Sequence, residues 1–71
     1  MVFSDTVRLI RKRLDLSQEQ LARELNISFS TVNRWEKGKN QPSQMAIEIF
    51  RQFCKDNNIE MDDITEMEEQ L

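Results

Sequence analysis

The sequence predicts an all-α fold, a compact five-helix bundle that forms a single domain over residues 1–71. Two observations carry this prediction. Apolar residues recur every three or four positions along most of the chain, which is the period of an amphipathic helix. The composition has one glycine, one proline and no tyrosine, and it is rich in Leu, Ile, Glu, Gln, Arg and Lys. A chain this short buries only about 60% of the surface exposed by its unfolded form, so we expect a thin core.

The first two helices are predicted at residues 4–14 and 17–25. We expect Ser4 to be the N-cap of the first helix, whose apolar positions are Phe3, Val7, Ile10 and Leu14. A short break follows at Asp15 and Leu16. Ser17 and Gln20 then have the spacing of a capping box, in which each side chain accepts from the other residue's backbone N–H. The buried stripe of the second helix is Leu21, Ala22 and Leu25.

The third helix is predicted to begin after its cap Ser28 and to end at Gly38. Asn26 stands in the preceding turn, because asparagine tolerates the left-handed conformation, and glycine is the usual residue after a helix end. On a helical wheel Val32 and Trp35 face inward. The polar residues face outward, with Phe29 partly exposed at their edge: Ser30, Asn33, Arg34 and Lys37.

Two further helices are predicted after the loop at Pro42. Ser43 is the expected cap of a fourth helix over residues 43–56, and Cys54 is expected in its buried face. A single cysteine forms no internal disulfide, which favours a reducing cytoplasm. The apolar residues of the last segment predict a short fifth helix: Met61, Ile64, Met67 and Leu71.

The net charge of −3 is unevenly distributed. Residues 1–44 carry eight Lys or Arg against five acids, whereas residues 45–71 carry two against eight. An anionic partner is therefore expected to meet the first part of the chain.

Catalysis and metal binding have almost no support in the sequence, which has no histidine, no glycine-rich phosphate loop and no cysteine cluster. The acids of the last segment lack the alternating spacing and the glycine of a calcium loop. No apolar run approaches the roughly 20 residues that cross a membrane. We expect no enzyme, no cofactor, no small-molecule ligand, no membrane partner and a cytoplasmic location.

The second and third predicted helices, joined by a three-residue turn, have the order of a helix-turn-helix. The segments LSQEQLA, VNRWEKGK and PS stand at the distances that make the chain, from about Arg8 to Ser43, resemble the Cro/repressor-type (Xre) helix-turn-helix family. Asn26 replaces the more usual glycine of that turn. The resemblance implies a lambda-repressor-like fold and a bacterial or phage DNA-binding regulator, commonly a homodimer on a near-palindromic site.

The resemblance also implies roles for individual residues. The residues that it implies contact base edges in the major groove are Phe29, Ser30, Asn33 and Arg34. Their chemistry fits, since arginine pairs with guanine, asparagine with adenine, and phenylalanine touches the thymine methyl. The residues that it implies contact the DNA backbone are Gln18, Arg11, Ser28, Lys37, Lys39 and Asn40. Arg11 is also expected to pair with Glu36.

Simpler interpretations stay open for several of these residues. Arg34 and Lys37 can be an ordinary solvated helix face, Phe29 can fold back onto its own helix, and Gln18 can serve only the cap. Arg11 and Glu36 can be purely structural.

The prediction for the whole chain is a sequence-specific regulator that binds double-stranded DNA as a homodimer, with half-sites about 34 Å apart. The dimer face is expected among Phe53, Ile59, Met61, Ile64 and Met67. The chain begins with Met1 and ends in a charged run, which favours a complete short protein.

Two other classes remain: a protein-interaction module such as an antitoxin, or the DNA-targeting domain of a larger protein. The sequence does not distinguish a prophage repressor from the controller of a restriction–modification system, nor activation from repression.

Overall fold

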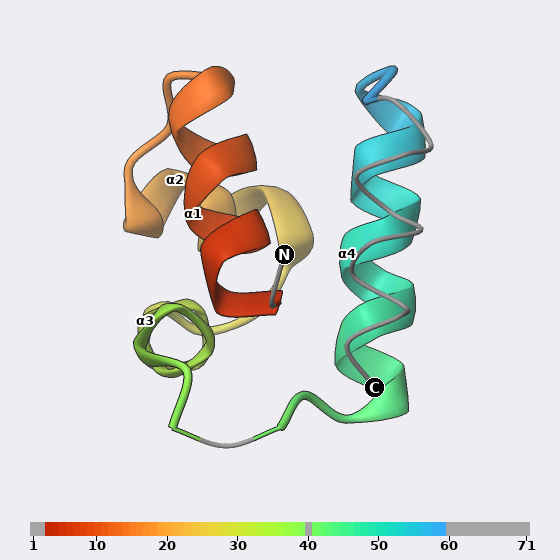
Figure 1. The fold of residues 1–71 in the computed structure, drawn as a ribbon. Coiled ribbons are helices and arrows are strands. Elements are labelled where there is room, and N and C mark those ends of the chain that lie inside the picture. The colour runs from red at the N-terminus through yellow and green to blue at the C-terminus, as the bar shows by residue number, and fades with distance from the viewer. Residues whose placement is uncertain (1–2, 40, 60–71) are drawn as a thin grey trace.

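A computed structural model describes residues 3–39 and 41–59, and four helices and no strand occur in this part of the chain (Figure 1). The helices are α1 (Phe3–Arg13), α2 (Gln18–Leu25), α3 (Phe29–Lys37) and α4 (Gln44–Asp56). The all-α prediction is confirmed. The predicted count of five helices is not matched, because the described part has four; the segment assigned to the fifth helix, with Met61, Ile64, Met67 and Leu71, lies outside the described residues.

The first three helices pack together, and α4 stands along one side of them (Figure 1). α3 packs against both α1 and α2, so it is held from two directions. This arrangement leaves the side of α3 that is opposite to those contacts available to solvent.

Capping residues set the ends of α2 and α3 as the sequence predicted. Ser17 Oγ accepts from the Gln20 backbone N–H at 3.1 Å, and Gln20 Oε1 accepts from the Ser17 N–H at 2.7 Å, which completes the capping box. Asn26 adopts the left-handed conformation with φ 57° and ends α2. Ser28 and Ser43 cap α3 and α4, each through its side-chain oxygen.

The prediction that Ser4 caps the first helix is wrong, because α1 already includes Phe3 and Ser4 lies within its first turn. The physical reason is the burial of Phe3, whose ring packs edge-on against Trp35 with centroids 5.3 Å apart. Ser4 instead lies against Gly38 at the end of α3. A Cβ on Gly38 would lie 2.7 Å from Ser4 Oγ, and Gly38 has φ 66°, so both the contact and the backbone require glycine.

All four described helices contribute to the aromatic and aliphatic core, and its aromatic part lies where α1, α3 and α4 meet. Phe50 of α4 is fully buried and makes edge-on contacts with Phe3 and Trp35, at 5.9 and 6.5 Å between centroids. Trp35 is partly buried against this cluster and Val32 is fully buried, as the helical wheel predicted. Cys54 is buried and forms no disulfide.

Two residues that were predicted in a dimer face belong to the core of the single chain instead. Phe53 is 7% exposed and Ile59 is 9% exposed. The reason for the second is the turn after α4, in which Asn58 has φ 58° and the Ile59 N–H donates to the Cys54 carbonyl at 2.9 Å. This turn returns the chain to the core, much as left-handed C-caps do. The other residues proposed for that face, Met61, Ile64 and Met67, lie outside the described residues.

Candidate nucleic-acid interface

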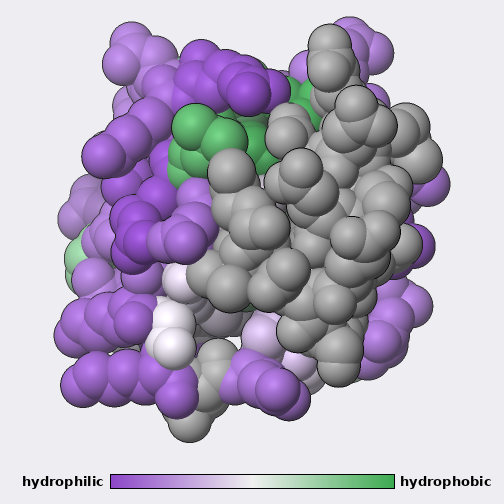
Figure 2. Space-filling view, viewed as in Figure 1, coloured by the Kyte–Doolittle hydropathy of each residue, from purple (hydrophilic) through white to green (hydrophobic). Residues whose placement is uncertain are grey.

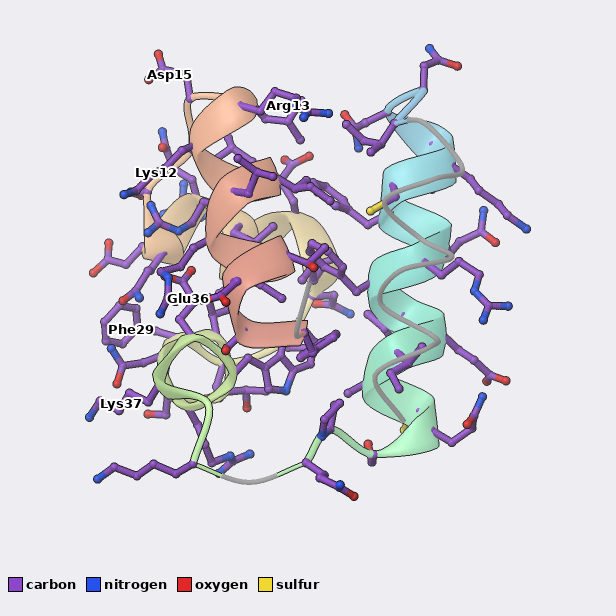
Figure 3. The ribbon with its side chains drawn as sticks, in the orientation of Figure 1. Lys12, Arg13, Asp15, Phe29, Glu36 and Lys37 are labelled. Atoms are coloured by element: carbon purple, nitrogen blue, oxygen red, sulfur yellow. The ribbon has the colours of Figure 1, made fainter. Side chains whose placement is uncertain are left out.

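The outward side of α3 carries the residues predicted to contact bases. Ser30 and Arg34 are exposed, Asn33 is half-buried, and Phe29 is 47% exposed, so its ring is not folded into the core. Figure 3 shows Phe29 and Lys37 extending from α3 away from α1 and α4. The four predicted base-contact residues therefore share one helix, and three of them are exposed.

The N-terminal end of this helix is fixed by Ser28. Its Oγ accepts from the Thr31 backbone N–H at 3.1 Å and lies 2.8 Å from the Thr31 hydroxyl. Ser28 is exposed, but its hydroxyl already serves the cap. Its predicted contact with the DNA backbone would have to use the remaining hydrogen-bonding capacity of that hydroxyl or the peptide backbone of Ser28.

An ion pair joins α1 to α3 beneath this surface. Arg11 donates from Nε to Oε2 of Glu36 at 2.6 Å and from Nη2 to Oε1 at 3.0 Å, and its Nη1 donates to the Leu16 carbonyl at 3.0 Å. The side chains of Arg11 and Glu36 are only 16% and 5% exposed. The side-chain hydrogen bond with Glu36 raises the pKa of Arg11, and burial partly opposes this. The predicted pairing is confirmed, and Figure 3 shows Glu36 directed from α3 toward α1.

Gln18, the first residue of α2, extends this ion pair to the outward side of α3. Its Nε2 donates to Oε1 of Glu36 at 3.1 Å, and its Oε1 accepts from Nδ2 of Asn33 at 3.1 Å. We call the four residues Arg11, Glu36, Gln18 and Asn33 the Glu36 network. This network connects α1, α2 and α3. Two of its members, Arg11 and Gln18, are predicted to contact the DNA backbone, and a third, Asn33, is predicted to contact a base.

Sequence reasoning missed the bond between Gln18 and Asn33 and the central place of Glu36. One signal was available. Asn33 and Glu36 are three residues apart on α3 and therefore lie on neighbouring positions of its surface. A residue at the start of α2 that reaches one of them can reach both.

Arg8 is a further residue that sequence reasoning left out of the site. Its Nη1 donates to the Glu36 backbone carbonyl near the end of α3, and its Nη2 pairs with Asp5. A cation at this place favours the C-terminus of a helix, where carbonyl groups lack partners. Arg8 thus links α1 to the end of α3, with its charge paired to Asp5.

Two lysines lie on the same side of the molecule as Phe29 (Figure 3). Lys12 of α1 extends to the same side as Phe29 and Lys37, while Arg13 lies on the other side of α1 (Figure 3). Lys39, just after α3, is exposed, whereas Asn40, a predicted backbone contact, lies outside the described residues. Hydrophilic residues surround a small hydrophobic patch over the upper part of α1 and α2 (Figure 2).

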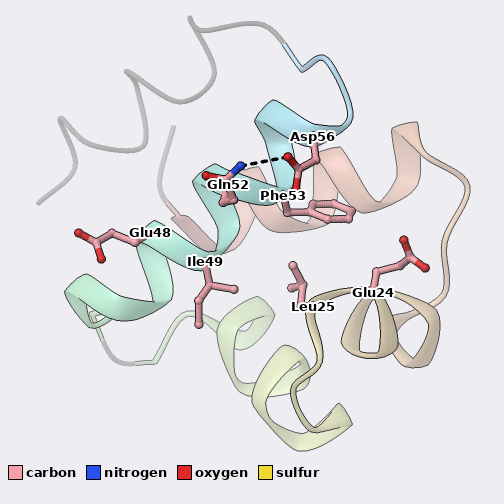
Figure 4. A pocket seen from close by; sticks show the side chains of 7 residues that line it. All are labelled: Glu24, Leu25, Glu48, Ile49, Gln52, Phe53 and Asp56. Carbon is pink, nitrogen blue, oxygen red and sulfur yellow. Dashed lines mark hydrogen bonds between the residues drawn. The ribbon is translucent and has the colours of Figure 1, made fainter.

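A groove of about 410 Å³ lies between α2 and α4 (Figure 4). Three of its lining residues are acids, and none of the described residues that line it is Lys or Arg: Glu24, Leu25, Glu48, Ile49, Gln52, Phe53 and Asp56. Its acidic rim disfavours a polyanion, so an anionic partner is better accommodated along α1 and α3.

No three His, Cys, Asp or Glu residues within 3–39 and 41–59 are grouped so that they could hold a metal ion. None of the helices there has both the length and the apolar character needed to cross a membrane.

Comparison with known proteins identifies the family. A family model described as helix-turn-helix matches residues 7–54. The chain is similar to the HTH-type transcriptional activator BcrR of Enterococcus faecalis, with 32% identity over 53 residues. That stretch is 75% of this chain and 26% of the relative, so the chain spans about a quarter of that protein. No solved structure matches significantly. The chain belongs to the Xre-type helix-turn-helix family.

Proposed function

We propose that this chain binds specific DNA sequences by inserting α3 into the major groove. The observation that supports the proposal is the outward side of α3, where polar and aromatic side chains stand on a helix held by α1 and α2. Arginine and asparagine there can pair with guanine and adenine, and Phe29 can contact a thymine methyl group. The proposed base-contact residues are Phe29, Ser30, Asn33 and Arg34.

Contacts with the DNA backbone would position α3 in the groove. Gln18 uses one N–H of Nε2 for Glu36 and keeps a second N–H for a phosphate, next to the N-terminus of α2. Arg11 uses Nε, Nη1 and Nη2 for one hydrogen bond each. Each of its two Nη groups therefore keeps a second N–H for a phosphate. The full proposed set is Gln18, Arg11, Ser28, Lys37, Lys39 and Asn40.

A single α3 spans too few base pairs for useful specificity, so we propose a homodimer on a near-palindromic site, with half-sites about 34 Å apart. Phe53 and Ile59 are buried within one chain and are not proposed for the dimer face. Met61, Ile64 and Met67 remain its candidates from sequence alone. A regulator of this kind would act in the cytoplasm of a bacterium, encoded by the cell or by a phage.

The test is selection of bound sequences from a pool of randomised DNA duplexes, followed by fluorescence titration of the selected duplex at several salt concentrations. We expect an inverted repeat, a steep decrease of affinity with salt, and loss of preference at one base pair in each half-site in Arg34→Ala. Weak binding without a motif at low salt would contradict DNA recognition by this chain alone. The protein-interaction module would then be the better hypothesis.

A further inference from the structure

The Glu36 network begins at a group that can only accept hydrogen bonds. At neutral pH a glutamate carboxylate has no donor, and both oxygens of Glu36 are used. Oε2 accepts from Arg11, and Oε1 accepts from Arg11 and from Gln18. Glu36 is buried and Arg11 is nearly so, and water therefore competes little for these bonds.

This carboxylate fixes the orientation of the Gln18 amide. If the amide turned over, Gln18 Oε1 would face Glu36 Oε1 at the 3.1 Å now spanned by Nε2, and two acceptors would meet. Glu36 Oε1 would keep its bond from Arg11 but lose the one from Gln18 and face a second acceptor, which is costly for a buried carboxylate. Gln18 must therefore point its nitrogen at Glu36, and its oxygen is left for Asn33.

The orientation of the Asn33 amide follows by the same argument. Gln18 Oε1 lies 3.1 Å from Asn33 Nδ2, so a turned Asn33 would again place oxygen against oxygen. Within the described residues, Asn33 Oδ1 accepts no hydrogen bond, and the second N–H of Nδ2 has no acceptor. Asn33 thus keeps one N–H of Nδ2 as a donor and Oδ1 as an acceptor. The bond to Gln18 fixes which of the two lies on which side.

We propose that Glu36 is a positioning residue that sets the base preference of Asn33 without contacting DNA. The inference rests on the proposed function. A fixed donor and acceptor match N7 and N6 of adenine, which is the usual partner of asparagine. An amide free to turn would present the opposite order equally well and would discriminate less. We therefore expect adenine at the base pair that Asn33 contacts, and a weaker preference wherever the network is broken.

The experiment compares four variants by binding selection from randomised duplexes. Asn33→Ala identifies the base pair that residue 33 contacts, because the preference there should drop from roughly five- to a hundredfold to about twofold or less. Gln18→Met and Glu36→Gln should weaken the preference at that same base pair. Lys37→Met is the matched control, since it removes a proposed phosphate contact outside the network and should lower affinity equally for all sequences.

A second measurement uses the free protein and the NMR order parameter of the Asn33 side-chain NH₂ group. We expect a rigid group in the wild type and in Lys37→Met, and a mobile one in Gln18→Met and Glu36→Gln. Gln18→Met leaves the ion pair of Arg11 and Glu36 in place, so it tests the network even if Glu36→Gln does not fold.

The outcomes separate the inference from the function on which it rests. If the wild type selects no motif, the proposed function fails, and the inference fails with it. If Asn33→Ala removes a preference that Gln18→Met retains, DNA recognition stands and the inference is overturned. An Asn33 amide that stays rigid in Gln18→Met would overturn it as well.

Discussion

The side formed by α1 and α3 and the groove between α2 and α4 are built from equally amphipathic helices, but they are held together differently. Directional hydrogen bonds of the Glu36 network tie α1, α2 and α3. The groove has apolar walls, and the hydrogen bond drawn there, from Gln52 to Asp56 at 3.0 Å, stays within α4 (Figure 4). Apolar contact gives stability without direction, whereas aiming a polar side chain requires directional bonds. Variants on the two sides should therefore separate stability from recognition.

The largest effect is expected from the core that α4 closes. Phe50→Ala should lower the free energy of unfolding by about 3–5 kcal/mol, because it removes a fully buried ring that packs against Phe3 and Trp35. Urea denaturation followed by circular dichroism measures this. Met45→Ala, on the same helix but 71% exposed, is the control and should change stability by less than about 0.5 kcal/mol. Equal costs for the two variants would mean that α4 does not pack as described.

The ion pair comes next. Arg11→Met should cost about 3 kcal/mol, because it leaves the carboxylate of Glu36 buried without its cation. The double variant Arg11→Met/Glu36→Met should cost less than the sum of the two single variants, and chemical denaturation of all three gives this coupling.

The cost of losing Arg11 should not depend on pH in the neutral range. The raised pKa of Arg11 means that the arginine stabilises the fold at every pH below its ordinary value and loses this effect only above it. Arg11→Met should therefore cost the same at about pH 6 and about pH 9. A cost that vanished at the higher pH would contradict the assignment.

A smaller effect is expected where α1 meets the end of α3. Gly38→Ala should cost about 1–2 kcal/mol, because alanine is strained at φ 66° and its Cβ would meet Ser4 Oγ. The double variant Gly38→Ala/Ser4→Ala should recover part of this cost, because it lacks the Ser4 hydroxyl oxygen. Thermal unfolding of the single and double variants tests this. No recovery would assign the whole cost to the backbone conformation.

The sequence predicted all four described helices, and the bounds of α2, α3 and α4 follow from local capping signals. The capping box of Ser17, the left-handed Asn26 and the terminal Gly38 depend on their immediate neighbours. What sequence reasoning missed depends on contacts between helices. Ser4 was misassigned because Phe3 is drawn into the core, and Ile59 because a turn folds it back.

The same division holds within the site. The outward residues of α3 follow from helical periodicity, so Phe29 and Arg34 were placed correctly on the surface. The bond between Gln18 and Asn33 joins positions 15 apart, and only the crossing of α2 and α3 brings them together.

The smallest effect concerns the charge of the two sides. Lys37→Met should weaken DNA binding several-fold and reduce the salt dependence by about one unit of slope, since it removes one proposed phosphate contact. Glu48→Gln, in the rim of the groove, removes a charge of the opposite sign and should leave that slope unchanged. Both residues are exposed, so neither variant should alter stability by more than about 0.5 kcal/mol. Fluorescence titration at several salt concentrations compares them directly. If both variants changed the slope equally, DNA would sense only the total charge of the chain, and the side formed by α1 and α3 would have no special place in binding.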